Sequence, residues 1–159
     1  MRLPFNPGSL LLAVALLVLY VPALDGQILD WDDPTWVADP LLQLPFFEAL
    51  KVAFGTLHDR AWYPLLRMSW WLQHAITGDA TRPMHAVNLG LFALSIPLVH
   101  HLLERCGLSA RASFVATTLW AAHPTRVESV AWLTSRKDVL SLVFVLLTAH
   151  ALLSRRAWL

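Results

Sequence analysis

Charged residues are scarce in this sequence of 159 residues: Lys, Arg, Asp and Glu together make up 14% of it, and hydrophobic residues make up 57%. Average soluble domains carry roughly 25% charged residues. There is a single cysteine, Cys106, which excludes an internal disulfide and a zinc site made from cysteines of this chain. The formal net charge of +1 gives no reason to expect a nucleic-acid partner.

Sequence motifs of several soluble enzyme classes are also missing. The chain has no glycine-rich phosphate-binding loop and no G-x-S-x-G motif, which argues against P-loop NTPases and serine hydrolases. The seven histidines are scattered, and none forms an H-E-x-x-H pair or another zinc-binding pattern. Any chemistry therefore has to come from carboxylates, basic groups and single histidines.

The apolar residues are gathered into four runs, at residues 10–24, 84–103, 108–122 and 139–155. A membrane-spanning helix needs about 20 apolar residues, and the shorter runs reach that length if flanking arginines snorkel or the helices tilt. We therefore expect an all-α membrane protein of one domain, residues 1–159, with about four transmembrane helices and a long first outer loop at residues 25–83. The first run also fits a signal peptide, with Arg2 at its start and Val21-Pro22-Ala23 as a cleavage site.

The long loop contains apolar residues at helical spacing rather than a polar linker. Phe46, Leu50, Phe54 and Leu57 share one helical face, which predicts an amphipathic helix lying in the membrane interface. Residues 65–76 predict a second such helix. The alternative is that both are core helices of a small extracytoplasmic domain.

Basic residues favour an orientation with the N-terminus in the cytoplasm. Arg111 follows the short turn after the second run, and Arg155 and Arg156 lie in the C-terminal tail. Short cytoplasmic segments are enriched in Lys and Arg, whereas long loops cross the membrane largely regardless of charge. The loop at 25–83 and the segment at 123–138 are then extracytoplasmic, and we expect a bacterial inner membrane rather than an endoplasmic reticulum.

An acidic cluster follows the first apolar run. Asp30, Asp32 and Asp33 lie within four residues, and neighbouring carboxylates raise one another's pKa, so that one of them can serve as a base. Two of them can also supply oxygen ligands to a divalent cation. The alternative is a solvated turn, since Asp33-Pro34 is common turn chemistry.

Two more polar clusters flank residue 130. In the first, His123, Arg126 and Glu128 follow the third apolar run, and Thr125 with Glu128 also fits a helix-capping box. In the second, Arg136, Lys137 and Asp138 precede the fourth run.

The cations of these two clusters suit a phosphate headgroup at the interface, while Ser135 and Asp138 again fit a capping box. His85 and Asn88 share a helical face at the outer end of the second run, where a packed hydrogen-bonded pair is the alternative to a functional role.

These clusters resemble, in this order, the N-terminal membrane region of the TMTC-type proteins, which are tetratricopeptide-repeat-containing protein O-mannosyltransferases with bacterial relatives. The resemblance covers nearly the whole chain from Tyr20 to Leu153. The matching motifs are Trp31-Asp32-Asp33-Pro34, Trp62-Tyr63-Pro64-Leu65 with Ser69, His85-x-Val87-Asn88, residues 123–132 and residues 136–141. The family often has a basic residue or His before the Pro-Leu pair, where this chain has Tyr63, and Arg67 follows instead.

The resemblance implies the N-terminal part of a GT-C type fold and a glycosyltransferase that uses a polyprenyl- or dolichyl-phosphate sugar. By this resemblance Asp32 and Asp33 are the acidic site that acts as base towards a protein or glycan hydroxyl, and Glu128 is a second acid. Arg126, Arg136 and Lys137 face the lipid phosphate, and His85, Asn88, His123 and Asp138 support them. It also implies that the first run is retained as a membrane span.

The family usually continues through further helices and tetratricopeptide repeats, and the chain is short enough that we expect both to be absent. The alternative function is therefore a non-catalytic fragment or a small membrane subunit that needs a further membrane chain. A small transporter component is a third hypothesis, with His100 and His150 as its weak support.

Overall fold

The computed structural model describes residues 7–155, and within them the chain is helical apart from one isolated β-bridge between His58 and Ala61. The elements in chain order are α1 (Pro7–Leu17), the 3₁₀ helix η1 (Val18–Asp25), α2 (Asp33–Val37), the 3₁₀ helix η2 (Pro40–Gln43), α3 (Phe46–Gly55), α4 (Pro64–Thr77), α5 (Thr81–Arg105), α6 (Ala110–Ala121), α7 (Arg126–Ala131) and α8 (Arg136–Arg155). The expected all-α class is confirmed.

Local sequence signals set several helix ends. Proline lies in the first turn of both α2 and α4, where its missing N–H is not needed. Ser109 caps α6 through a hydrogen bond from the Ala112 amide at 3.3 Å. Gly107 ends α5 with a φ of 97°, and the amides of Gly107 and Leu108 donate back to Glu104 and Leu103. This hydrogen-bond pattern is a Schellman motif, which needs a left-handed residue and therefore favours glycine.

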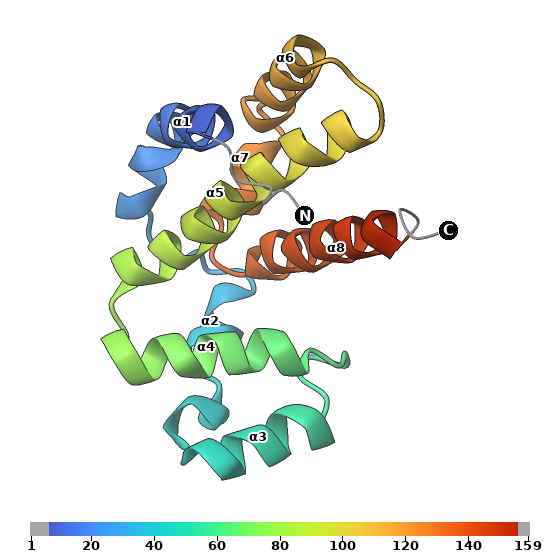
Figure 1. Cartoon of the computed structure of the whole chain (residues 1–159). Helices are drawn as coiled ribbons and strands as arrows, with labels where there is room; N and C mark the ends of the chain where they lie inside the picture. The colour runs from blue at the N-terminus through green and yellow to red at the C-terminus, as the bar shows by residue number, and fades with distance from the viewer. Residues whose placement is uncertain (1–6, 156–159) are drawn as a thin grey trace.

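A bundle of long helices forms the larger part of the molecule. In Figure 1, α5 runs through the centre, with α1, α6 and α8 around it. Its core contains Leu16, Tyr20, Phe92, Ile96 and Val139. The Tyr20 hydroxyl also donates to the Ala121 carbonyl, so η1 is fixed to the end of α6 by a bond as well as by packing.

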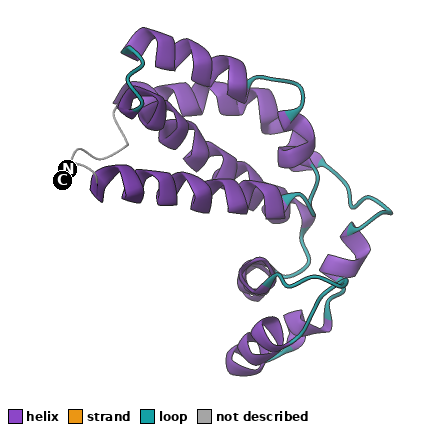
Figure 2. Ribbon diagram, turned by 90° about the vertical axis from the view of Figure 1, so that its right-hand side faces the viewer, coloured by secondary structure: helices purple, strands orange, loops and turns teal. Residues whose placement is uncertain are grey.

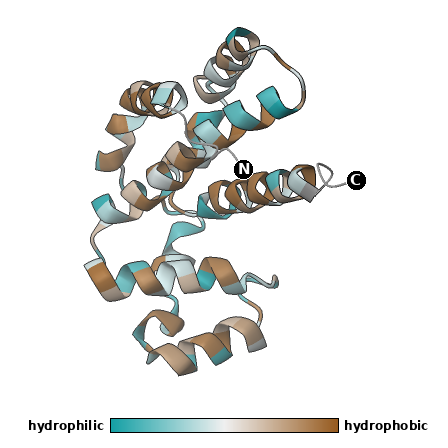
Figure 3. Cartoon of the chain, in the orientation of Figure 1, coloured by the Kyte–Doolittle hydropathy of each residue, from teal (hydrophilic) through white to brown (hydrophobic). Residues whose placement is uncertain are grey.

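Three helical segments in the described part of the chain are long and apolar enough to cross a membrane: Pro7–Asp25, Thr81–Arg105 and Arg136–Ser154. They correspond to the first, second and fourth expected spans, and Figure 3 shows α1 and α8 as largely hydrophobic. The expected span at residues 108–122 is α6, whose 12 residues rise about 18 Å, less than the hydrocarbon core of about 30 Å. That α6 crosses the membrane stays a prediction.

The shorter helices form a second group with its own core. Figure 2 shows small helices lying beyond one end of the long bundle, joined to it by loops. Trp36, Leu41, Ala53, Leu66 and Trp70 are buried together where α2, η2, α3 and α4 meet.

Helices α3 and α4 each keep a second apolar face that is not used in this packing. Phe47 and Phe54 are exposed on α3, and Leu65, Leu72 and Ile76 are exposed on α4. Each of the two helices therefore buries one face in a core, as expected for a small domain. Each also exposes an apolar face, as expected for a helix in the membrane interface. Their placement in a membrane interface stays a prediction.

Candidate functional site

The acidic loop before α2 and the loop between α7 and α8 meet at one end of the bundle. Asp33 makes the main link: its Oδ2 accepts a hydrogen bond from the Leu29 amide at 2.8 Å, and its Oδ1 accepts one from the Thr134 amide at 3.1 Å. The rings of Trp31 and Trp132 meet edge to face, with centroids 5.7 Å apart. The structure therefore brings together two motifs that lie 101 residues apart.

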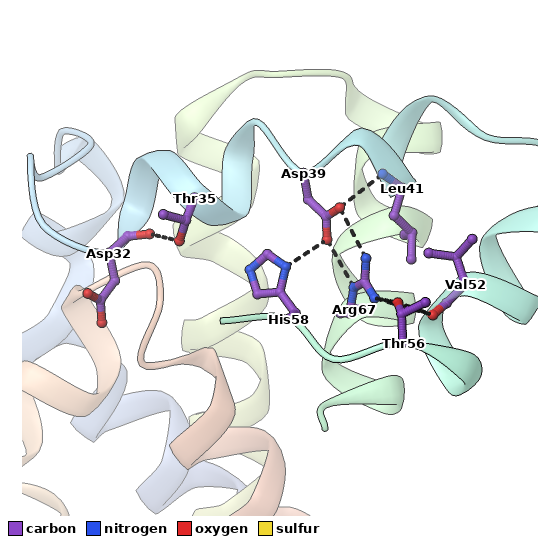
Figure 4. A network of polar contacts seen from close by, with 8 residues as sticks. All are labelled: Asp32, Thr35, Asp39, Leu41, Val52, Thr56, His58 and Arg67. Atoms are coloured by element: carbon purple, nitrogen blue, oxygen red, sulfur yellow. Dashed lines mark hydrogen bonds and ion pairs between the residues drawn. The ribbon is translucent and has the colours of Figure 1, made fainter. Parts of the chain in front are cut away.

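The two expected acidic residues have different surroundings. Asp33 has no exposed surface, and both of its carboxylate oxygens accept main-chain hydrogen bonds. Asp32 is exposed, and in Figure 4 its carboxylate points away from the neighbouring polar network. Asp32 thus has lone pairs open to a proton, whereas Asp33 holds the two loops together.

Arg136 and Asn88 are in direct contact inside the protein. Arg136 is fully buried; its Nε donates to Asn88 Oδ1 at 3.0 Å, and its Nη2 donates to Gln73 Oε1 at 2.6 Å and to the Met84 carbonyl at 3.1 Å. Its guanidinium also stacks over Trp70 at 3.9 Å from the ring centroid. The Asn88 amide donates in turn to the carbonyls of Trp132 and Leu133.

These contacts make Arg136 a cross-link between α4, α5 and the start of α8. Its Nη1 has no hydrogen-bond partner among the described residues. Because the guanidinium is enclosed, a phosphate could reach it only after local opening, so the expected direct phosphate contact stays a prediction.

His85 and Glu128 line one cavity of about 490 Å³ between the acidic loop and α7. Gln27, Trp31 and Trp132 also line it. His85 is 1% exposed, and Glu128 is exposed. The acidic loop before α2 and the segment that carries Glu128 therefore share a cavity. The acidic loop contributes Trp31 to this cavity rather than an aspartate.

The remaining cations line two other cavities along α8. Lys137 is half-buried and lines one of about 460 Å³ together with Trp62 and Phe144. Arg126 lines one of about 340 Å³ together with Phe92. Asp138 lines both, so these cavities adjoin around the first turn of α8. The expected phosphate-binding residues thus face more than one cavity.

His123 does not line any of these three cavities, and it contacts its own turn. Its exposed ring lies 2.9 Å from the Thr125 hydroxyl, which contributes no capping hydrogen bond to α7. The capping box expected from Thr125 and Glu128 is therefore not formed. Glu128 is left free of that role.

Sequence analysis missed a buried ion pair between Asp39 and Arg67. The Asp39 carboxylate accepts from Arg67 Nε at 3.0 Å and Nη2 at 3.2 Å, and it lies 3.3 Å from His58 Nδ1 (Figure 4). Arg67 Nη1 donates to Thr56 Oγ1 at 2.9 Å. Asp39 before Pro40 is a local signal for a helix cap, but a partner 28 residues away leaves no signal in the sequence.

A divalent cation is one possibility that the acidic cluster raises. No group of three or more His, Cys, Asp or Glu side chains within the described residues is arranged to hold a metal ion. Asp33 is buried and uses both oxygens on main-chain amides, whereas Asp32 is exposed, so the two carboxylates differ in their availability to a cation.

Comparison with known proteins reveals similarity to O-mannosyl-transferases of two animals. The chain is 26% identical over 152 residues to protein O-mannosyl-transferase F38B6.6 of Caenorhabditis elegans, covering 87% of this chain and 22% of that protein. It is 33% identical over 99 residues to protein O-mannosyl-transferase Tmtc2 of Drosophila melanogaster, covering 62% of this chain and 11% of that protein. The chain thus spans about a fifth or less of the length of these relatives. No family model matches it, and no solved structure does.

Proposed function

Because this chain is a distant relative of the TMTC-type protein O-mannosyltransferases over much of its length, we propose that it takes part in a membrane glycosyl transfer. The proposed donor is a hexose, mannose by this similarity, on a polyprenyl or dolichyl phosphate, and the proposed acceptor is a hydroxyl group of a protein or glycan. The proposal depends mainly on one observation, the meeting of two motif loops at one end of a bundle with three candidate membrane spans.

The proposed reaction sets clear chemical requirements. The acceptor oxygen forms a bond to the anomeric carbon of the sugar, and the bond from that carbon to the phosphate oxygen breaks. The acceptor proton passes to a carboxylate, and the departing lipid phosphate gains a negative charge. The site therefore needs a base with an open lone pair and cations beside the phosphate.

We assign these roles by exposure and position. Glu128 and Asp32 are the candidate bases, because both are exposed, whereas the oxygens of Asp33 are used by the Leu29 and Thr134 amides. Arg126 and Lys137 bind the donor phosphate, since each lines a cavity with apolar side chains beside a candidate span.

The other expected residues have positioning roles in this proposal. Arg136 and Asn88 fix the first turn of α8, which carries Lys137 and Asp138. His85 lies beside the Glu128 cavity. His123 orders the turn before α7 through Thr125.

The proposal includes an orientation with the N-terminus in the cytoplasm and the motif loops outside, in a bacterial inner membrane. That both motif loops lie at the same end of the bundle supports placing them together on one side of the membrane. At the other end, His101 stacks on His150, and Arg105 donates to the His150 carbonyl near the turn that carries Cys106.

The test uses the chain in lipid nanodiscs with a radiolabelled mannosyl polyprenyl phosphate. Donor binding is measured first, and transfer of label to a Ser- and Thr-containing peptide second. The double variant Arg126→Ala with Lys137→Ala should weaken donor binding by about tenfold or more, because a hydrogen bond to a charged group contributes about 1.5–3 kcal/mol. Arg111→Ala removes an exposed cation on α6 and should bind the donor normally.

Glu128→Gln and Asp32→Asn should bind the donor, and the variant that loses transfer identifies the base. Unchanged donor binding by the Arg126 and Lys137 double variant would contradict the assigned phosphate site. Donor binding without transfer by the unaltered chain would support the alternative, in which the chain is a subunit that needs a further membrane chain.

A further inference from the structure

The cavity beside His85 is lined by buried polar groups that are weakly hydrogen-bonded within residues 7–155. Neither ring nitrogen of His85 makes a hydrogen bond of ordinary geometry with a described residue, although the main chain of Gly26 and Ala131 approaches the ring. The Trp132 indole N–H is also buried without an acceptor among the described residues. Because buried polar groups are nearly always hydrogen-bonded, these two groups make the wall of the cavity polar enough to suit a ligand with hydroxyl groups.

The charges around this cavity favour a neutral ligand. Glu128 is its one formally charged lining residue, and Gln27 adds an amide, while Arg126 and Lys137 line the other two cavities. An anion would meet a carboxylate here and no lysine or arginine. A purely hydrocarbon chain would leave the imidazole, the amide and the carboxylate desolvated, which is unfavourable.

An aromatic wall gives the cavity a flat apolar surface. Trp31 lines the cavity and is 76% exposed although its ring meets the Trp132 ring edge to face, so most of the Trp31 ring is left uncovered. A sugar ring has one or two apolar C–H faces and a rim of hydroxyls. It matches a tryptophan face combined with carboxylate, amide and imidazole groups.

Gly26 has the role of leaving space for His85. A Cβ at position 26 would lie 2.8 Å from both Cε1 and Nε2 of the buried His85 ring, although the backbone of Gly26 is in an extended conformation that any residue adopts. The glycine is therefore needed for the close approach of the ring and not for its own backbone angles. A side chain at this position would displace the imidazole.

We propose that the cavity lined by Gln27, Trp31, His85, Glu128 and Trp132 is a subsite for a neutral hexose ring, with Trp31 as its stacking surface. The choice of a sugar among neutral ligands with hydroxyl groups rests on the proposed function. In this subsite Glu128 and Gln27 bind hydroxyls of the ring, while the buried imidazole helps to form the wall. The phosphate of the donor lies outside it, towards Arg126 or Lys137.

The test measures binding of methyl mannoside to the chain in nanodiscs by saturation-transfer NMR, without any lipid donor. Trp31→Ala should weaken binding roughly fivefold, because an aromatic stacking contact with the sugar is lost. The fold should be retained, because Trp31 lies in a loop and is largely exposed. Gly26→Ala should weaken it further by moving the imidazole. Phe47→Ala removes another exposed aromatic, on α3, and should leave binding unchanged.

Mannose 6-phosphate should bind no better than methyl mannoside, since no lysine or arginine lines the subsite. Absence of glycoside binding, a Trp31→Ala variant that binds normally, or markedly tighter binding of the phosphate ester would each overturn the inference. If the glycoside binds and depends on Trp31 while no lipid donor is bound or consumed, the subsite stands and the proposed function fails. If label is transferred with a normal KM in the Trp31→Ala variant, the function stands and the subsite fails.

Discussion

At the scale of single residues, burial separates side chains that the sequence places side by side. Arg136 and Lys137 are neighbours, yet the first is fully enclosed with Asn88, Gln73 and Trp70, and the second lines an open cavity. A buried arginine is stable here because three acceptors and an aromatic face replace water around its guanidinium. Its role is therefore predicted to be structural.

Replacing Arg136 by Ala should lower the free energy of unfolding by about 3 kcal/mol, because the oxygens of Gln73 and Asn88 lose a charged donor. For a chain of this size, that change corresponds to a fall in apparent Tm of roughly 6–12 °C. Lys137→Ala is the matched control and should change the stability by about 0.5 kcal/mol or less. Thermal unfolding in detergent, followed by circular dichroism, measures both. A stable Arg136→Ala variant that fails to bind the lipid donor would instead favour a direct phosphate contact.

At the scale of elements, α3 buries its small residues and exposes its large aromatic ones. The residues that pack into the protein are the small ones, Ala49 and Ala53, while Phe47 and Phe54 are exposed. Small residues allow α3 to approach α4 closely. The large side chains of Phe47 and Phe54 then lie on the outer face of α3. An exposed aromatic face next to a membrane bundle favours the headgroup region.

A fluorophore at position 54 should therefore be quenched by lipids that carry a quencher near the headgroups. The label is introduced as Phe54→Cys in a Cys106→Ser background, because Cys106 is the chain's single cysteine. Glu48→Cys is the comparison, since this exposed position lies more than 100° around the helix from Phe54. Weak quenching at both positions would place α3 in water and favour a small extracytoplasmic domain.

At the scale of the whole molecule, the two motif loops lie at one end of the bundle, near the start of α5. The turn that carries Cys106 follows the last residue of α5, at the other end of this helix. A 25-residue helix rises about 37 Å, which is longer than the hydrocarbon core. If α5 crosses the membrane, the motif loops and Cys106 have to face opposite sides.

Cys106 is exposed and so acts as a native reporter of this topology. In intact cells, a membrane-impermeant thiol reagent should leave Cys106 unlabelled and should react after permeabilisation. The variant Glu128→Cys with Cys106→Ser should show the reverse, with labelling in intact cells. Labelling of both cysteines from the same side would contradict the spanning role of α5 and, with it, the proposed extracytoplasmic site.

The sequence by itself determined the helical class and three of the apolar spans, because the length of an apolar run and the residues at its ends are local properties. It also indicated the resemblance to the TMTC-type O-mannosyltransferases, through motifs whose order along the chain is readable without a structure. Only the tertiary structure decided which of two adjacent aspartates is buried, which of two adjacent cations is enclosed, and that Trp31 meets Trp132. Those outcomes depend on contacts between residues 44 to 101 positions apart, and the free energy of such contacts comes from burial and hydrogen bonding that no local sequence pattern encodes.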